Sequence, residues 1–215
     1  MNTNPDAKRI LCYGDSNTQG VLPGSIGRHP ANIRWTGVLQ NELGADYEVI
    51  EEGLWGRTTN IDDPFPGFED KNGKTYLFPC IRTHVSLDWV ILWLGTNDLK
   101  KIFNRGGHEV ALGIEDLILS IRKDIAASKN GYDAPQIIVV SPNILTDKVV
   151  EVKPHFAGAP EKSKHLGEEL EKIAQKQDCK FIDLAKYVTA SEVDGVHLEK
   201  EDHAKVGKLL AKYIK

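Results

Sequence analysis

The sequence of 215 residues lacks several features that would assign it to a specialised class of protein. No apolar run approaches the ~18 residues of a membrane span, and the first ten residues contain no apolar signal core. A formal net charge of −4 and an isoelectric point near 6.0 argue against nucleic acid or an anionic membrane as the main partner. There is no internal repeat, low-complexity tract or linker. These absences predict a cytoplasmic protein with neither a membrane nor a nucleic-acid partner.

Cysteine is scarce, and its positions do not indicate a metal site. The three cysteines, at positions 12, 80 and 179, are an odd number without metal-type spacing. The first and third lie in or beside apolar runs, so we expect buried thiols and a reducing compartment. His197 and His203 are six residues apart, a spacing that does not place two side chains on one face of a helix. We therefore expect no metal and no cofactor.

What the sequence does contain is a regular alternation of short apolar runs and longer segments with helical spacing. Apolar residues make up 40% of the chain and charged residues 27%, which is ordinary for a globular domain. The predicted strands are 10–13, 47–52, 88–94, 136–141 and 180–184, and the predicted helices are 34–43, 76–84, 108–128, 160–177 and 199–214. Segments 21–33, 53–74 and 143–158 are expected to be irregular loops. The pattern predicts an α/β fold, with five parallel strands covered by helices on both faces, in a single domain 1–215 whose residues 1–7 form a disordered tail.

The stretch that organises the chain is 9–20, RILCYGDSNTQG. Its apolar strand breaks at Gly14 into a turn that presents Asp15 and Ser16. A serine at the end of a parallel strand lies at the carboxyl edge of the sheet, where open α/β sheets bind ligands. Backbone N–H groups just after such a turn are unpaired and stabilise negative charge. On its own the segment also fits a structural turn, with Asp15 or Ser16 capping a helix.

Residues distant in the sequence converge with Ser16 at this edge. Gly53 and the segment Gly95–Asp98 follow later strands, and Asp194 and His197 precede the last helix. Ser16 would be a nucleophile, His197 its base, Asp194 the carboxylate that orients the base, and Asn97 a donor to a developing oxyanion. Each piece alone also fits an ordinary turn or helix cap. Their joint order on an alternating pattern favours catalysis.

These blocks resemble those of the SGNH (GDSL-type) hydrolases, named for serine, glycine, asparagine and histidine. The corresponding residues are Ser16, Gly53, Asn97 and His197, and the resemblance runs from about residue 9 to residue 214. Segments 34–37 (RWTG), 49–54 (VIEEGL) and 57–60 (RTTN) are similar to a narrower branch, the bacterial arylesterases with acyltransferase activity.

The resemblance implies a three-layer α/β/α, flavodoxin-like fold and ester hydrolysis through an acyl-enzyme, with transfer of the acyl group to alcohols as a further activity. It implies an oxyanion hole formed by the N–H groups of Ser16 and Gly53 and the side chain of Asn97, and a homo-oligomer. Two positions depart from the wider family. Asn17 stands where leucine is frequent, which predicts a more polar pocket wall, and Glu51 stands where many members have asparagine, as in the arylesterase branch.

Four further residues are candidates for binding a small-molecule ester substrate: Asp15 and Asn17 beside the serine, and Trp55 and Phe156 in loops expected to roof the site. Aromatic rings would wall off an acyl pocket and stack on an aryl or sugar leaving group, or they fill ordinary loop cores. The polar segment 17–20 (NTQG) offers no long apolar channel. We therefore expect short acyl groups, acetyl to butyryl.

Rival enzyme classes fit the motifs less well. An α/β-hydrolase elbow, G-x-S-x-G, would need glycine where Thr18 stands, and a phosphate-binding loop would need lysine after Gly20. A non-catalytic ligand-binding module would have lost site residues, whereas every position here is filled. The substrate stays open among aryl and short alkyl esters, O-acetylated sugars, and the thioesters or lysophospholipids that the same chemistry cleaves.

Overall fold

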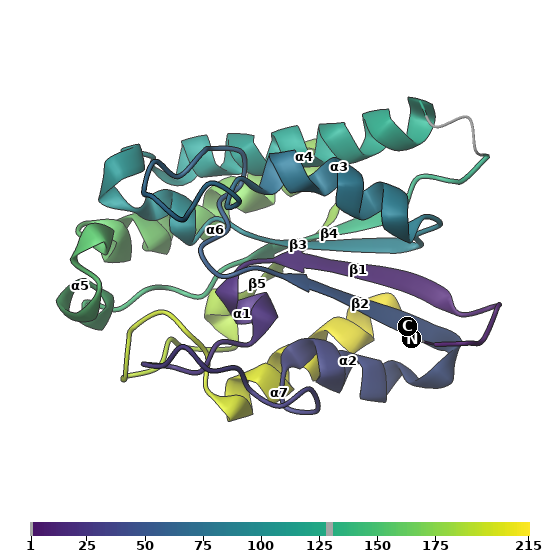
Figure 1. The fold of residues 1–215 in the computed structure, drawn as a ribbon, viewed down its shortest axis with the longest axis horizontal. Helices are drawn as coiled ribbons and strands as arrows, with labels where there is room; N and C mark the ends of the chain where they lie inside the picture. Colours follow the sequence, from purple (N-terminus) through teal and green to yellow (C-terminus); the bar gives the residue numbers. More distant parts are fainter. Residues whose placement is uncertain (1, 128–130) are drawn as a thin grey trace.

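A computed structural model describes residues 2–127 and 131–215 of the chain. Its centre is a five-stranded sheet with the strand order β2-β1-β3-β4-β5, in which every neighbouring pair is parallel (Figure 1). The strands are β1 Lys8–Gly14, β2 Tyr47–Gly53, β3 Trp89–Trp93, β4 Gln136–Ser141 and β5 Lys180–Asp183. The five predicted strands and their parallel pairing are confirmed.

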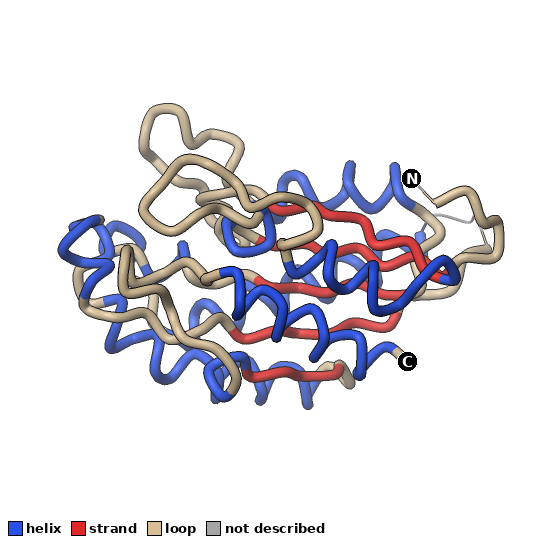
Figure 2. The backbone as a smooth tube through the Cα atoms, turned by 90° about the horizontal axis from the view of Figure 1, so that it is seen from below, coloured by secondary structure: helices blue, strands red, loops and turns tan. Residues whose placement is uncertain are grey.

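Helices cover both faces of the sheet, as the alternation predicted. The long helices are α2 Trp35–Leu43, α3 Gly73–His84, α4 Gly107–Ala127, α6 Ala159–Lys176 and α7 Lys200–Ile214. Helices α3, α4 and α6 lie on one face and α2 and α7 on the other, which gives the three-layer α/β/α sandwich (Figures 1 and 2).

Alternate side chains of the strands supply the two cores. In β1, Leu11 and Tyr13 pack with residues of α3 and α4, whereas Ile10 and Cys12 pack with residues of α2 and α7. Successive strand residues point to opposite faces, so a strand buried on both sides is apolar at nearly every position. The continuous apolar runs of the sequence have this cause.

The short helices were not predicted from the sequence, because a segment of a few residues is too short to show a helical period. Segment 143–158 is not wholly irregular, because it contains α5 (Lys148–Val152) and a 3-10 turn, Pro154–Phe156. The four residues after β1, Ser16–Gln19, form the short helix α1. Further 3-10 turns are Gly44–Asp46, Asn97–Leu99, Lys101–Phe103 and Leu184–Lys186. The predicted end of the α4 helix, at Ser128, lies outside the described residues.

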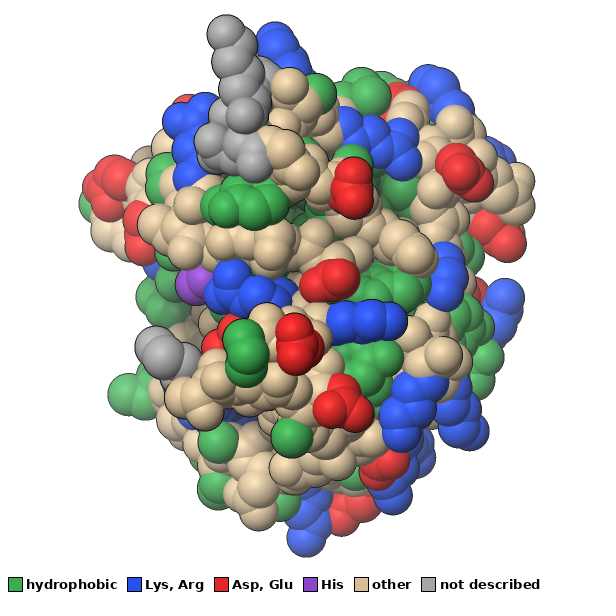
Figure 3. All heavy atoms as spheres, turned by 90° about the vertical axis from the view of Figure 1, so that its right-hand side faces the viewer, with side chains coloured by type: hydrophobic (Ala, Val, Ile, Leu, Met, Phe, Trp, Pro, Cys, Tyr) green, Lys and Arg blue, Asp and Glu red, His purple; other side chains and the backbone are tan. Residues whose placement is uncertain are grey.

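The surface at the amino ends of the strands, opposite the site described below, carries interleaved acidic and basic side chains (Figure 3). Asn2, within the segment predicted as a tail, donates from its side-chain amide to the carbonyl oxygens of Ala45 and Tyr47. In the described part of the chain, no helix has the length and apolarity needed to cross a membrane.

Candidate active site

The candidate nucleophile lies at the start of a helix that turns sharply off the central strand. The Oδ1 atom of Asp15 accepts a hydrogen bond from the Asn17 N–H at 3.0 Å and so caps α1, whose first residue is Ser16. A Cβ atom at Gly14 would lie 2.0 Å from Thr18 Oγ1, and one at Gly53 would lie 2.1 Å from the Gln19 nitrogen. Helix α1 therefore packs directly on the ends of β1 and β2, and only glycine leaves room for it.

Ser16, His197 and Asp194 form a continuous chain of contacts. His197 Nε2 lies 3.0 Å from Ser16 Oγ, and His197 Nδ1 lies 2.5 Å from Asp194 Oδ2. Serine and histidine are 8% and 6% exposed, and the aspartate is 2% exposed, so solvent barely competes for these contacts. The structure thus brings together three residues from the two ends of the chain in the order that proton transfer from the serine requires.

Asn17 holds the histidine segment against α1. Its Oδ1 accepts a hydrogen bond from the Leu198 N–H at 3.1 Å, and its Nδ2 donates to the Val196 carbonyl at 3.3 Å. These contacts bracket His197 on both sides. Asn143, after β4, donates to the same Val196 carbonyl at 3.2 Å. The residue after the serine therefore fixes the distance between the serine and the histidine.

Asp194 is surrounded by donors. Its Oδ1 accepts from the N–H groups of Val196 and His197, and its Oδ2 accepts from the Gly24 N–H as well as facing the imidazole. Burial raises the pKa of the Asp194 carboxyl, but the hydrogen bonds and charge of His197 and the N–H of Gly24 outweigh burial and hold the pKa well below its usual range. The Lys153 ammonium, 3.9 Å from Oδ2, adds a positive charge. Asp194 is thus an anion throughout the neutral range.

Asp15 is the opposite case. Its Oδ2 is buried without a hydrogen-bond partner, and its side chain is reached by one backbone N–H through Oδ1. Burial, with the nearby charge of Asp98, raises the pKa of the Asp15 carboxyl to about 7, although the Asn17 N–H, the charge of Arg57 and the Thr96 side chain oppose the shift. Near neutrality this carboxyl is partly protonated.

The neighbouring strands bring two further predicted residues to the same edge. Gly53 ends β2 and Asn97 follows β3, and these strands flank β1 in the sheet. Asn97, 6% exposed, donates from Nδ2 to the carbonyl oxygen of Arg57 at 3.1 Å. An amide NH₂ has two donor hydrogens, so the second is available to a bound ligand.

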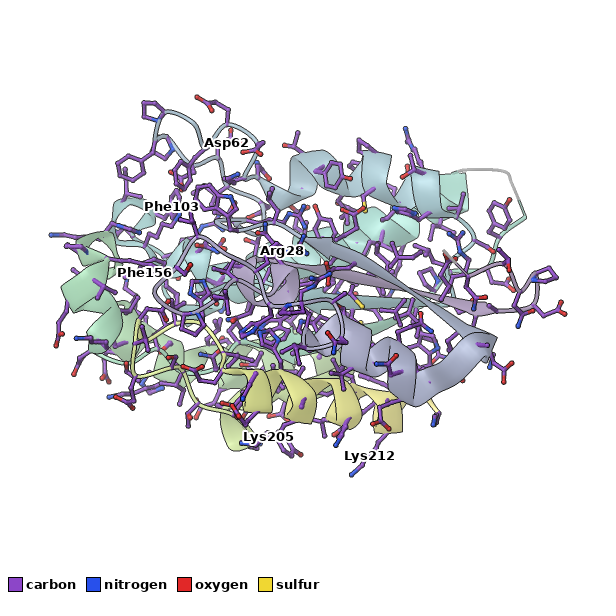
Figure 4. All side chains as sticks on the ribbon, turned by 60° about the horizontal axis from the view of Figure 1, so that its bottom comes forward. Arg28, Asp62, Phe103, Phe156, Lys205 and Lys212 are labelled. Atoms are coloured by element: carbon purple, nitrogen blue, oxygen red, sulfur yellow. The ribbon has the colours of Figure 1, made fainter. Side chains whose placement is uncertain are left out.

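Three of the four residues predicted to bind substrate are committed elsewhere. Asp15 and Asn17 are each 1% exposed and make the contacts described above, by which Asn17 tethers the histidine segment. Phe156 is 3% exposed and belongs to the apolar core on the face of the sheet that α3, α4 and α6 cover, at the end of the molecule that also holds Phe103 (Figure 4). Its loop turns inward through the 3-10 turn that the sequence did not reveal. Trp55 is 45% exposed and remains accessible.

A polar network that the sequence did not reveal supports the loop after β2. Arg57 donates to the Gly14 carbonyl at 3.0 Å, and its guanidinium lies 4.2 Å from the Tyr13 ring. Asp98 accepts from the N–H of Thr59 at 2.9 Å and from Arg105 at 3.0 Å. In the sequence, only the motifs 57–60 and 95–98 pointed to these residues. No role in such a network could be assigned to them from the sequence.

Comparison with known proteins agrees with this geometry. A model of the family described as GDSL-like Lipase/Acylhydrolase matches residues 12–205. Among curated proteins, an acetylxylan esterase of Xylanibacter ruminicola is 25% identical over 98% of this chain. The chain spans 44% of the length of that relative.

Solved structures are similar over almost their full length. Est24, a carbohydrate acetylesterase from Sinorhizobium meliloti, superposes with a TM-score of 0.90 at 34% identity, covering 96% of this chain and 98% of that one. The inhibitor-bound aryl esterase of M. smegmatis gives a TM-score of 0.91 at 38% identity, covering 97% and 98%. The similarity therefore extends over nearly the whole fold.

Proposed function

The chain belongs to the GDSL-like lipase/acylhydrolase family and is a carboxylic ester hydrolase, and from this premise we propose that Ser16 cleaves esters of short acyl groups with aryl or sugar leaving groups. The observation that carries the proposal is the buried chain of contacts from Ser16 Oγ through the His197 ring to Asp194, at 3.0 and 2.5 Å. A serine hydroxyl becomes a strong nucleophile when an oriented base takes its proton.

In the first step, His197 Nε2 takes the hydroxyl proton as Ser16 Oγ bonds to the carbonyl carbon of the ester. Asp194, an anion held by four donors, stabilises the imidazolium that forms. The carbonyl oxygen becomes an oxyanion, and the donors assigned to it are the free hydrogen of Asn97 Nδ2 and the N–H groups of Ser16 and Gly53.

In the second step, the bond to the leaving oxygen breaks and His197 returns the proton to the leaving alcohol. The acyl group stays on Ser16 as an ester. Water, or an alcohol in the transfer reaction that we also propose, then gives its proton to His197 as it attacks the acyl carbon. The bond between that carbon and Ser16 Oγ breaks, His197 returns the proton to Ser16, and the acid or a new ester is released. The residues thus act twice in the same roles.

The preference for short acyl groups rests on what surrounds the serine. Asn17 and Thr18 are buried polar residues, 1% and 0% exposed, and Asn17 is fully occupied by the histidine segment. They leave no apolar channel in α1 for a long chain. Each methylene buried in an apolar channel would gain about 0.8 kcal/mol. We expect kcat/KM on p-nitrophenyl esters to peak at or below about four carbons, and a rate still rising at roughly eight carbons contradicts the proposal.

Trp55 and Phe65, 45% and 43% exposed in the loop after β2, support an aryl or sugar leaving group. Exposed aromatic rings present an apolar face on which such groups stack. Relatives named acetylxylan esterase and carbohydrate acetylesterase make a carbohydrate O-acetylesterase the second candidate function. Rates on p-nitrophenyl acetate and on an acetylated xylo-oligosaccharide, each with and without added alcohol, distinguish the two functions and detect transfer.

The direct test of the proposal is Ser16→Ala. Because no other group replaces the nucleophile, we expect kcat to fall by about 10⁴-fold or more, with circular dichroism unchanged. Near-normal turnover in a folded variant would refute the mechanism. A homo-oligomer and a cytoplasmic location remain predictions, of which the first is checked by light scattering coupled to gel filtration.

A further inference from the structure

A second cluster of chemically active side chains lies on the face of the sheet that α3 covers. Glu52 is the penultimate residue of β2, and Cys80 and His84 lie in α3. Their ligand atoms, a carboxylate oxygen, a sulfur and a ring nitrogen, all lie within 4.8 Å of one another. In the described part of the chain this is the one group of three such side chains that meets this distance.

The backbone explains why these side chains converge. Cys80 and His84 are four residues apart in α3, so they share one face of the helix. Glu52 pairs with Tyr13 of β1, whose side chain packs on the α3 side of the sheet, so Glu52 points to that side too. Arg9 Nη1 donates to the His84 carbonyl at 2.8 Å and fixes the end of α3 over the edge of the sheet.

We propose that Glu52, Cys80 and His84 form a binding site for a divalent transition-metal ion of the zinc type. One carboxylate, one thiolate and one imidazole are ligands that Zn²⁺ accepts together, whereas Mg²⁺ and Ca²⁺ prefer oxygen alone. Zinc would bond to a Glu52 carboxylate oxygen, Cys80 Sγ and His84 Nε2, with the thiol proton released to solvent.

The distances need only a small adjustment. Tetrahedral zinc with bonds of about 2.0–2.3 Å separates neighbouring ligand atoms by roughly 3.3–3.7 Å. Glu52 Oε1 and His84 Nε2 already lie 3.2 Å apart. The longest side of the triangle, up to 4.8 Å, has to shorten by about one ångström, which side-chain rotation supplies.

The site is accessible from one side. The side chains of His84 and Glu52 are 27% and 21% exposed, whereas Cys80 is fully buried. A groove of about 500 Å³ opens beside Glu52, with Thr75, Tyr76 and Pro79 among its lining residues. Of the three ligands, Glu52 lines this groove, and water would take the fourth coordination position at zinc.

Binding would clamp α3 to the edge strand immediately before Gly53. Ser16, Asn97 and His197 do not line the groove, whereas Gly53, whose N–H is assigned to the oxyanion, does. The proposal does not rest on the esterase mechanism, because none of the three metal ligands takes part in it. It also departs from the expectation of no metal, which rested on cysteine spacing and overlooked the helical spacing of Cys80 and His84.

The test is titration of the chelator-treated protein with Co²⁺ alone, followed by displacement with Zn²⁺. We expect one equivalent of Co²⁺ to give a near-ultraviolet charge-transfer band from a thiolate, to be displaced by Zn²⁺, and to raise the melting temperature. Cys80→Ser should remove the band. His84→Ala, at a partly exposed position, should weaken binding by about 100-fold or more.

The chain offers two matched controls. His108 lies 3.1 Å from Glu169, a similar histidine–glutamate pair without a cysteine, and Cys179 is a half-buried thiol elsewhere. His108→Ala and Cys179→Ser should both bind Co²⁺ as the unmodified protein does. Absence of binding to the unmodified protein, a band that survives Cys80→Ser, or normal affinity in His84→Ala would overturn the proposal. Since His84→Ala keeps the buried thiol, its result decides the matter even if Cys80→Ser fails to fold.

Discussion

Asp194 and Asp15 are both buried carboxylates beside the serine–histidine pair, but the segments that carry them treat them differently. The turn 191–198 surrounds Asp194 with backbone N–H groups and the His197 ring, whereas the β1–α1 turn gives Asp15 one N–H and leaves Oδ2 without a partner. The pKa of Asp194 is therefore lowered, and that of Asp15 is raised to about 7. Burial raises the pKa of both carboxyls, and the donors and the charge of His197 outweigh burial at Asp194, whereas the weaker set of donors at Asp15 does not.

The segments that carry Asp194 and Asp15 therefore have different roles. The Asp194 segment supplies a permanent anion to a base, so its removal should affect turnover. The Asp15 segment supplies the position of Ser16, so its removal should affect stability and its dependence on pH.

Asp194→Asn should have the largest effect among the variants that keep the nucleophile. Asparagine favours the wrong tautomer of His197 and does not stabilise the imidazolium, so we expect kcat to fall by up to about 10⁴-fold. The matched control is Asp183→Asn, because Asp183 also caps a turn by accepting a backbone N–H, from Ala185. Steady-state kinetics of both variants make the comparison, and a loss below tenfold for Asp194→Asn would show that Asp194 is not the orienting group.

Asn97→Ala should have the next largest effect. Loss of one oxyanion donor is expected to lower kcat by about 10²–10³-fold with KM nearly unchanged, since the donor acts on charge that develops only in the transition state. Asn97→Asp keeps the size of the side chain but removes the donor, and it should lose at least as much. An effect confined to KM would instead make Asn97 a ground-state binding residue.

Asp15→Asn should have the smallest effect on turnover and a measurable effect on stability. The pKa of Asp15 in the folded protein, about 7, lies above its ordinary value of 3.8, so between these values the folded state holds a proton that the unfolded state has released. Stability therefore falls as the pH rises through this window, and the penalty is complete above about pH 7. Asparagine keeps the capping oxygen and removes the charge.

At pH 8 we accordingly expect Asp15→Asn to unfold at a higher urea concentration than the unmodified protein, with a free energy of unfolding that is larger by an amount on the order of a few kcal/mol. Near pH 4 the free energy of unfolding should increase little. Urea titrations of both proteins at several pH values measure the difference. An equal gain at pH 4 and pH 8 would mean that the charge of Asp15 has no part in it.

The fold was largely predictable because its signals are long. The run 136–141 is apolar at nearly every residue, and helix α4 carries an apolar stripe that recurs on every turn. The strands, the long helices and the type of sheet could therefore be predicted from periodicity. Helix α5, Lys148–Val152, spans too few residues to show a period, and it therefore lay unseen inside a predicted loop.

The residues of the candidate active site also differ in how far the sequence predicts their positions. The approach of Gly53 and Asn97 to Ser16 was predictable because parallel strands bring their carboxyl ends to one edge of the sheet, and Asp194 and His197 were predictable from their three-residue spacing before the last helix. The contacts of Asn17 and Phe156 were not predictable, because they depend on which way a loop turns after it leaves that edge. The helical spacing of Cys80 and His84 could be recognised in the sequence. The position of Glu52 beside them could not, because it depends on the register of β2 in the sheet.

The central claim is that Ser16 forms a covalent acyl-enzyme, and its most direct measurement is the site of reaction with a p-nitrophenyl alkylphosphonate. Such a reagent phosphonylates the serine that an adjacent base activates, and it releases p-nitrophenol. We predict one adduct per chain by intact mass, located on the peptide that contains Ser16, and none in Ser16→Ala. An adduct on any other residue, or equal labelling of Ser16→Ala, would contradict the account.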